Sequence, residues 1–398
     1  MTKRFLCYLK TLGAILLAGC MMFLAFRILD FPMKNSFYFR FMYKMDDAHG
    51  TLVNEHAEKS RESCQSKRNI FFLKTHKTAS STIINILFRY GEFHNLTFAF
   101  PVRSSLYSYP NFFSASYVDG FSVDGNKTFN IMCHHMRFML TEVKKVMPND
   151  TFYFTVMRNP ISLFESSFSY WRKNTPFVKA KNLEDFLNNS SAYYDAVTQN
   201  RHLVKNLMAF DLGFDPKENK TINKIQFMLN LTDTIFDLVL ITEYFDESLI
   251  LLKEALCWSF DDVLSFPLNR RSNNTMKTLT LETQEKIKRW NSLDWQLYVH
   301  FNNSFWELVE KFGRERMQHE IGILQMKRAE MEKTCLQGEV APSQLKDKSM
   351  IPYQSGIATI LGYNLKPGLT TPYQLLCRRL VTPELQYNSL LHDKQKIM

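Results

Sequence analysis

Three short apolar runs in this chain are each followed by a polar segment and then by apolar positions at helical spacing. The first run is residues 70–73, and polar residues 74–81 separate it from a helical pattern that begins at residue 82. Residues 151–157 repeat the arrangement, with Pro160 at the start of a predicted helix over 161–171. Residues 236–242 and 243–258 form the third pair. Buried parallel strands are near-continuously apolar, so the pattern predicts an α/β fold, a parallel sheet flanked by helices.

Three further segments have weaker patterns. Residues 94–102 and 129–138 are predicted to be short strands, separated by a loop rich in aromatic residues. Residues 279–335 are highly charged with helical periodicity, which predicts a helical layer with one solvated face. No internal repeat is present in the sequence.

The N-terminus carries an uncharged stretch, residues 11–26, which follows Lys3, Arg4 and Lys10. Positive charge in front of an apolar segment predicts a cytoplasmic N-terminus and a luminal remainder. A cleaved signal peptide is the alternative, but Arg27 precedes an aromatic-rich segment and no small-residue cleavage site. We therefore expect a cytoplasmic tail over 1–10, a signal-anchor transmembrane helix over 11–29, a polar stem over 30–68 and a luminal domain over 69–398.

N-glycosylation acceptor patterns run through the body of the chain and agree with a luminal location. They begin at Asn95, Asn126, Asn149, Asn188, Asn189, Asn219, Asn230, Asn273 and Asn302. In that oxidising compartment some of the luminal cysteines can pair, and because they are odd in number at least one is left over. These are Cys64, Cys133, Cys257, Cys335 and Cys377. No spacing typical of a metal site occurs among the cysteines, so no metal is expected.

The composition is basic, with 49 Lys and Arg residues against 39 Asp and Glu residues. A positive field suits an anionic ligand, a nucleic acid or a membrane surface, although a solvated basic surface is equally compatible. A luminal body argues against a nucleic-acid partner. The oligomeric state cannot be predicted from the sequence.

The turn after the first strand is the best candidate for an anion site. A helix that begins directly after such a turn directs its free N–H groups into the turn, where they attract an anion. Small residues at 78–81 let the backbone approach a phosphate, and Lys77 supplies a mobile positive charge. The glycines of a nucleoside-triphosphatase loop are absent, so the turn is better interpreted as a relative of that loop.

The run LKTHKTASST resembles the galactose 3-O-sulfotransferases, which use 3′-phosphoadenosine 5′-phosphosulfate (PAPS). The similarity continues through FNIMCHHMRF, MPNDTFYF, FDLVLI, LDWQLYVHFN, PYQSGIATILGYNLKPG and CRRLVTPELQY, covering nearly everything after the stem. The resemblance implies a P-loop-like sulfotransferase fold in a Golgi membrane protein of single-pass type II topology. It further implies transfer of a sulfuryl group from PAPS to the 3-hydroxyl of a terminal galactose, without a metal.

The same resemblance implies the cofactor contacts. An Arg at a strand end and a Ser eight residues later hold the 3′-phosphate in sulfotransferases, and Arg158 and Ser166 have this spacing. Glu165 is expected to face elsewhere, because adjacent helix residues point apart. For Lys74, contact with the sulfate and mere closure of the strand are equally compatible. The predicted cofactor-binding residues are Lys74, Thr75, Lys77, Thr78, Ala79, Ser80, Ser81, Thr82, Arg158 and Ser166.

Sulfuryl transfer requires a base for the attacking hydroxyl and a cation for the departing oxygen. Histidine has an ordinary pKa of about 6.5, which suits a general base, so His76 is the predicted base and Lys77 the predicted cation. His134 and His135 end another predicted strand and are candidate acceptor contacts, although a structural role is the commoner one. Arg270 and Arg271 are equally compatible with a ligand contact or a solvated loop. Candidate stacking residues for adenine or galactose are Tyr107, Tyr109, Phe168, Trp171 and Trp295.

Two alternatives remain open from the sequence. A Golgi glycosyltransferase would share the anchor, the sequons and the α/β body, but no two aspartates are separated by one residue, as Asp-x-Asp requires. A non-catalytic glycan-binding paralogue would be expected to lose the site residues His76, Lys77, Arg158 or Ser166, and all four are present.

Overall fold

The structure of the protein is a computed structural model that describes residues 64–102, 105–125, 127–216, 221–272 and 278–397. The predicted cytoplasmic tail and signal anchor, and the stem up to residue 63, lie outside these ranges. None of the helices in the described part is both long and apolar enough to cross a membrane.

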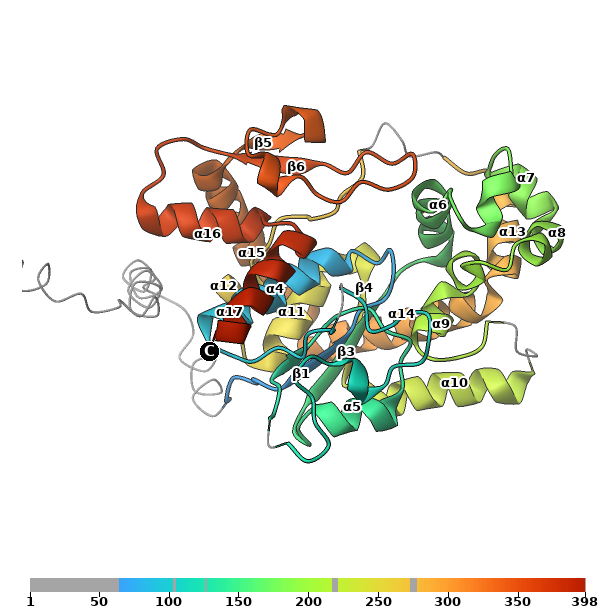
Figure 1. Cartoon of the computed structure of the whole chain (residues 1–398), viewed down its shortest axis with the longest axis horizontal. Helices are drawn as coiled ribbons and strands as arrows, with labels where there is room; N and C mark the ends of the chain where they lie inside the picture. The colour runs from blue at the N-terminus through green and yellow to red at the C-terminus, as the bar shows by residue number, and fades with distance from the viewer. Residues whose placement is uncertain (1–63, 103–104, 126, 217–220, 273–277, 398) are drawn as a thin grey trace, which may run out of the picture. The chain divides into compact units, whose positions relative to one another are not determined.

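A four-stranded parallel sheet forms the centre of the fold, in the order β2-β1-β3-β4. The strands are β1 (Ile70–Leu73), β2 (Ile131–Met132), β3 (Phe152–Met157) and β4 (Leu238–Ile241). Nearly every strand residue is buried, which explains their continuous apolar sequences. The predicted α/β architecture with a parallel sheet is therefore confirmed (Figure 1).

Helices cover both faces of this sheet. The β1-to-β2 and β2-to-β3 connections cross the sheet in opposite directions, so right-handed crossovers place α4 and α5 on opposite faces (Figure 1). The longer helices are α4 (Ser80–Phe93), α6 (Pro160–Tyr170), α10 (Ile222–Ile235), α11 (Phe245–Leu256), α13 (Leu281–Trp290), α14 (Ser292–Phe312), α15 (Arg314–Cys335), α16 (Thr371–Val381) and α17 (Glu384–Ile397). The shorter ones are α5 (Leu140–Val146), α7 (Leu183–Asn188), α8 (Ser190–Ala196), α9 (Leu207–Asp211) and α12 (Phe260–Val263).

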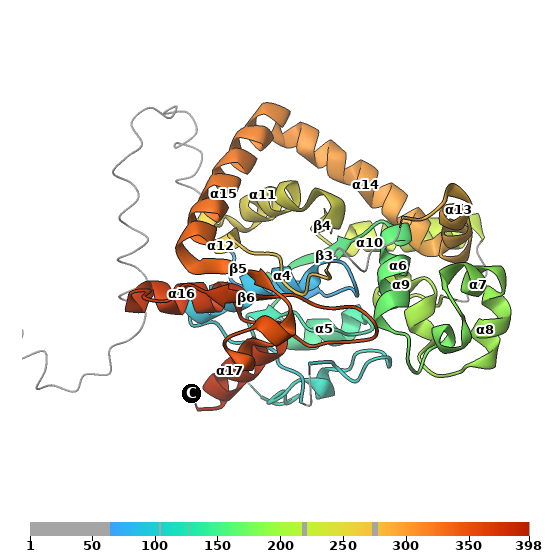
Figure 2. The ribbon, with the colours of Figure 1, turned by 90° about the horizontal axis from the view of Figure 1, so that it is seen from above.

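The predicted helices after each strand are present as α4, α6 and α11. The charged region 279–335 folds as α13, α14 and α15, and α14 and α15 pack apolar residues such as Leu297, Phe301 and Leu324 into the main core. This confirms a helical layer with a solvated face. Figure 2 shows α14 and α15 as two long helices that meet at an angle at the top of the view.

Two strand predictions were wrong in extent. Residues 94–102 form no strand, only isolated bridges such as Phe98 to Ile131. Asn95 adopts a left-handed backbone (φ 51°) and Pro101 has no N–H to donate, so a continuous ladder cannot form there. In the segment 129–138 only Ile131 and Met132 pair as a strand, and the chain then leaves the sheet.

The C-terminal part of the chain returns to the start of α4. Helix α17 packs along α4, where the Tyr387 hydroxyl donates to Oε2 of Glu92. A separate antiparallel hairpin, β5 (Leu336–Val340) and β6 (Gly362–Leu365), precedes it. Disulfides join Cys64 to Cys257 and Cys335 to Cys377, and Cys133 is free and buried, as the odd count predicted.

Candidate active site

The turn between β1 and α4 has the backbone of an anion-binding loop. Lys77 and Ala79 both adopt positive φ angles, 61° and 60°, in the left-handed region that favours glycine. Ala79 is the N-cap of α4 and provides no side-chain cap. Among the described residues no acceptor is bonded to the backbone N–H groups of Lys77, Thr78 and Ala79. The loop therefore presents free donors at the positive end of a helix without using glycine.

The hydroxyl groups of the turn are engaged inside the protein. Thr75 donates to the carbonyl of Val156 at 2.6 Å, and Ser80 donates to the carbonyl of Thr75 at 2.9 Å. Thr78 bonds to Thr75, Ser81 donates to Glu384, and Thr82 accepts from the Leu268 N–H. These bonds fix the shape of the loop on the end of β3. In this structure the backbone N–H groups, and not the hydroxyls, are the donors left for a ligand.

Several cationic side chains surround the turn. The Lys77 ammonium lies 3.6 Å from the ring centroid of Tyr170 on α6, and Nη1 of Arg158 donates to the Lys77 carbonyl at 2.8 Å. Burial of Lys77, together with the positive charges of Arg158, Arg271 and Lys74, lowers the pKa of Lys77 to about 7. Burial is the largest cause of this shift, and the three neighbouring cations show that positive charge is concentrated at the turn, which suits an anion.

Lys74 is buried and does not face solvent. Its Nζ forms an ion pair with Glu384, the first residue of α17, at 2.5 Å. Ser81 donates to the same carboxylate at 2.8 Å. Burial raises the pKa of Glu384, but the Lys74 ammonium and the Ser81 hydroxyl outweigh that effect, so its pKa lies below the ordinary glutamate value. This ion pair connects the turn to the C-terminal helix, so of the two roles considered for Lys74 the geometry favours the structural one.

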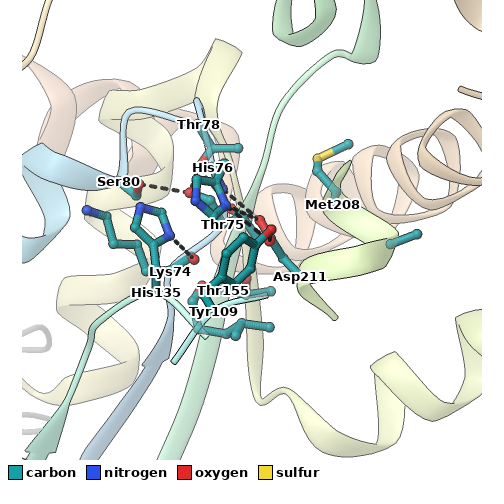
Figure 3. A network of polar contacts seen from close by, with 12 residues as sticks. Lys74, Thr75, His76, Thr78, Ser80, Tyr109, His135, Thr155, Met208 and Asp211 are labelled. Carbon is teal, nitrogen blue, oxygen red and sulfur yellow. Dashed lines mark hydrogen bonds and ion pairs between the residues drawn. The ribbon is translucent and has the colours of Figure 1, made fainter. Parts of the chain in front are cut away.

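His76 is held by a carboxylate. Its Nδ1 lies 3.0 Å from Oδ2 of Asp211, and its backbone N–H donates to the same oxygen at 2.8 Å. Tyr109 donates its hydroxyl to Oδ1 of Asp211 at 2.8 Å. Nδ1 must carry a proton to donate to a carboxylate, so in the neutral ring Nε2 carries the lone pair. Figure 3 shows the His76 ring between Asp211 and His135, with Tyr109 beside it.

The two histidines of the second candidate pair have different environments. The ring of His135 stacks on that of His76, with centroids 3.7 Å apart, and its Nδ1 donates to the Lys74 carbonyl at 2.9 Å. Burial and the neighbouring His76 keep the pKa of His135 well below its ordinary value. His134 is buried against Phe88 and bonds Asn388, and burial lowers its pKa to about 4. The geometry thus brings His135 to the site and gives His134 a structural position in the core.

Helix α6 carries the remaining predicted contacts. Ser166 is nearly buried, one turn before Tyr170 on the same side of α6. Among the described residues no hydrogen bond joins Ser166 to Arg158. The sequence predicted that Glu165 faces away from the site, and this prediction was wrong. Glu165 pairs with Arg271 at 2.6 Å, and its charge acts on both Lys77 and Arg158.

The remaining arginine and aromatic candidates also divide into residues near the site and residues away from it. Arg271 has a nearly buried side chain, whereas that of Arg270 is 47% exposed and pairs with Glu339. Of the aromatic candidates, Tyr109 and Trp171 lie beside the His76 ring, at 4.8 and 5.6 Å between centroids. Tyr107 and Phe168 belong to the hydrophobic cores. No group of acidic, histidine or cysteine side chains in the described ranges is arranged to hold a metal ion.

Two carboxylates that hold site residues in place were missing from the sequence predictions, Asp211 for His76 and Glu384 for Lys74. Asp211 ends the short helix α9, whose Met208 and Ala209 N–H groups donate to the buried carboxylate of Asp294 on α14. Burial raises the pKa of Asp294 to about 7. The only sequence signal for either residue would have been the chemical need of His76 and Lys74 for a partner carboxylate.

Comparison with known proteins identifies the family. The family described as Galactose-3-O-sulfotransferase matches residues 14–395. The chain belongs to the galactose-3-O-sulfotransferase family. Galactose-3-O-sulfotransferase 2 of Sus scrofa is 48% identical over 335 residues, covering 82% of this chain and 84% of that protein. Galactosylceramide sulfotransferase of Homo sapiens is 44% identical over 338 residues, 83% and 79% of the two chains. Galactose-3-O-sulfotransferase 4 of Homo sapiens is 36% identical over 409 residues, 84% of each.

Membership of the galactose-3-O-sulfotransferase family confirms the sequence-based recognition and the prediction of a sulfotransferase enzyme. It also argues against the alternative of a Golgi glycosyltransferase. The roles of individual site residues stay predictions, and the geometry determines which of them belong together. We call the turn with the free N–H groups of residues 77–79 the cradle, and Arg158 contacts it through the Lys77 carbonyl. Ser166 lies on α6, one turn before the Tyr170 ring that the Lys77 ammonium contacts. His76, Asp211 and His135 form a second connected group.

Proposed function

We propose that this protein transfers a sulfuryl group from PAPS to the 3-hydroxyl of a terminal, β-linked galactose on glycoprotein or glycolipid glycans. The observation that carries the proposal is the juxtaposition of a cationic turn of free N–H groups with the His76–Asp211 pair. Relatives at 48% and 44% identity are named for galactose and for galactosylceramide, respectively, which supports galactose as the acceptor.

The residues present suit the nucleotide. PAPS supplies the sulfuryl group and carries phosphates at its 3′ and 5′ positions. The N–H groups of Lys77, Thr78 and Ala79 are placed to bind the 5′-phosphosulfate, and the guanidinium of Arg158 with Ser166 to bind the 3′-phosphate. This assignment corresponds to a P-loop-like sulfotransferase fold.

The assignment of His76 as the general base rests on its hydrogen bonds. Asp211 holds the proton on Nδ1, so Nε2 can accept the proton of the attacking galactose hydroxyl. His135 is the weaker candidate because burial and His76 depress its pKa. The Lys77 ammonium stabilises the negative charge that develops on the departing oxygen.

The location of the enzyme is part of the proposal. The basic residues before an uncharged segment, together with the sequons, support a single-pass type II protein of the Golgi membrane with a luminal catalytic domain. Two disulfides in the described part agree with an oxidising compartment.

The test is a transfer assay with the full-length protein in detergent, labelled PAPS and a panel of acceptors. Terminal β-galactosides and galactosylceramide should accept label with EDTA present. The matched 3-O-methyl galactosides, which lack the reacting hydroxyl, should not. Absence of label on every galactose acceptor, or equal labelling of the 3-O-methyl compounds, would refute the proposal.

A further inference from the structure

Arg271 has an unusual environment beside the cradle. It lies in the connection between α12 and α13, and its backbone pairs with Ile360 in an antiparallel bridge. The side chain is only 10% exposed. Its Nη2 donates to Oε2 of Glu165 at 2.6 Å, while Nη1 is buried and has no hydrogen-bond partner among the described residues.

A buried guanidinium nitrogen without an acceptor is unfavourable, because arginine stays charged and its N–H groups lose water on burial. Native proteins keep such groups rare, and an unsatisfied one at a candidate anion site calls for an acceptor, which a bound anion would supply. Arg271 lies close enough to Lys77 and Arg158 for its charge to depress the pKa of both. Its free nitrogen therefore belongs to the same group of cationic side chains.

The charge balance of this group supports the same conclusion. Lys74 is paired with Glu384, which leaves the three cations Lys77, Arg158 and Arg271. Their neighbouring carboxylates among the described residues are two, Glu165 and Glu243. An anionic ligand would balance the remaining positive charge. Arginine is suited to this role because its planar fork can bond one partner with one nitrogen and a phosphate with the other.

The backbone around Arg271 is fixed before any ligand binds. Leu361 N–H donates to the Arg270 carbonyl at 3.0 Å, and Ser272 N–H donates to the Thr359 carbonyl at 2.9 Å. The loop that contains these partners is closely packed on α6. Gly356 has φ 63°, and a Cβ there would lie 2.4 Å from the Ser169 carbonyl oxygen. The backbone of Arg271 is thus held by the segment 356–361, which packs on α6, the helix that carries Glu165.

We propose that Arg271 is a further cofactor-binding residue, whose Nη1 donates to a phosphoryl oxygen of the nucleotide while Glu165 holds Nη2 in place. This inference rests on the proposed function for the identity of the ligand. The neighbouring Arg270 has no such role, because its side chain extends to Glu339 and is half exposed.

The experiment measures binding of adenosine 3′,5′-bisphosphate and adenosine 5′-monophosphate to the full-length protein in detergent. Arg271→Ala should weaken bisphosphate binding about tenfold or more, as loss of a charge-assisted hydrogen bond predicts. Arg271→Lys should recover only part of it. Arg270→Ala is the matched control and should bind like wild type. An Arg271→Ala variant that binds both nucleotides like wild type overturns the proposal.

A charge-neutral double variant separates direct contact from simple neutralisation of Glu165. If Arg271 contacts the phosphate, Arg271→Ala/Glu165→Gln should still bind the bisphosphate more weakly than wild type. If Arg271 only neutralises Glu165, the double variant should recover wild-type affinity, which would overturn the proposal. Thermal unfolding of each variant identifies any that are misfolded. If Arg271→Ala is misfolded, the affinity of the conservative variant Arg271→Lys is compared with that of wild type instead.

The two nucleotides also show which phosphate Arg271 binds. Weakening confined to the bisphosphate indicates the 3′-phosphate, and equal weakening of both nucleotides indicates the 5′ position. Failure of the proposed function gives a different result, since wild-type protein would then bind neither nucleotide.

Discussion

Nδ1 of His76 lies 3.0 Å from Oδ2 and 3.1 Å from Oδ1 of Asp211, so a single carboxylate fixes the ring of the proposed base. The backbone N–H of His76 and the hydroxyl of Tyr109 donate to the same carboxylate. This arrangement is the base-and-orienting-group pair of enzymes in which a histidine, held by a carboxylate, removes a proton from a hydroxyl. It makes separate predictions for the base and for the residue that positions it.

Replacement of the proposed base should abolish turnover without abolishing nucleotide binding. We expect His76→Ala to lower kcat by about 10²–10⁴, the usual contribution of a general base. Bisphosphate binding should change little, since the N–H cradle and Arg158 remain. Steady-state sulfation and direct nucleotide binding measure the two effects. Parallel loss of both would show that His76 is instead a structural residue of the turn.

Replacement of the positioning residue should have a similar effect on turnover by a different route. Asp211→Asn keeps the size of the side chain but loses the charge that holds the proton on Nδ1, so we expect kcat to fall by about 10²-fold or more. Tyr109→Phe, which removes one donor to Asp211, should cost less. The KM for PAPS should be unchanged in both variants. A raised KM with normal kcat would contradict the positioning role.

The sequence predicted the cradle because its residues are neighbours in the chain. Local periodicity located β1, β3 and β4 and the helices that follow them, and the small residues at 78–81 marked the turn. Ala79 and Lys77 show the limit of this approach, since both adopt left-handed backbone angles that their side chains disfavour. Only the packed surroundings of the turn can impose such a conformation.

The carboxylates of the site could not be predicted in the same way. His76 and Asp211 are 135 residues apart, and Lys74 and Glu384 are 310 residues apart. No local pattern connects such positions. Glu165 was misjudged for a related reason, because its ion-pair partner Arg271 lies on a distant segment of the chain.

Lys77 predicts a pH dependence of nucleotide binding. Its pKa is lowered to about 7 by burial and by neighbouring positive charges, and a bound polyanion would raise it again. The complex then holds more protons than the free enzyme above pH 7. Bisphosphate affinity should therefore fall as the pH rises from about 7 to 9, by at most about tenfold per pH unit.

The control for this prediction is Lys77→Arg, because arginine stays protonated throughout this range. Its affinity should be nearly independent of pH over the same interval. Isothermal titration calorimetry in buffers of different ionisation enthalpy would detect the proton uptake directly. A wild-type affinity that is flat between pH 7 and 9 would contradict the inferred deprotonation of Lys77 in the free enzyme.

The ion pair between Lys74 and Glu384 predicts that removing one charge costs more stability than removing both. Lys74 is only 4% exposed in its side chain, and Glu384 is 15% exposed. Glu384→Gln leaves the Lys74 ammonium buried without a counter-charge, so we expect the free energy of unfolding to fall by roughly 3 kcal/mol. Lys74→Met/Glu384→Gln removes the charges together and should recover much of that loss.

The pH dependence of this pair has a definite sign. Because the folded-state pKa of Glu384 is lowered, its contribution is complete above the ordinary glutamate value of about 4.3 and disappears as the pH falls through the folded-state pKa. Denaturant unfolding at pH 7 and at acidic pH should therefore show the difference between wild type and Glu384→Gln shrinking on acidification. An equal difference at both pH values would mean that the carboxylate stabilises the turn by its shape and hydrogen bonds, and not by its charge.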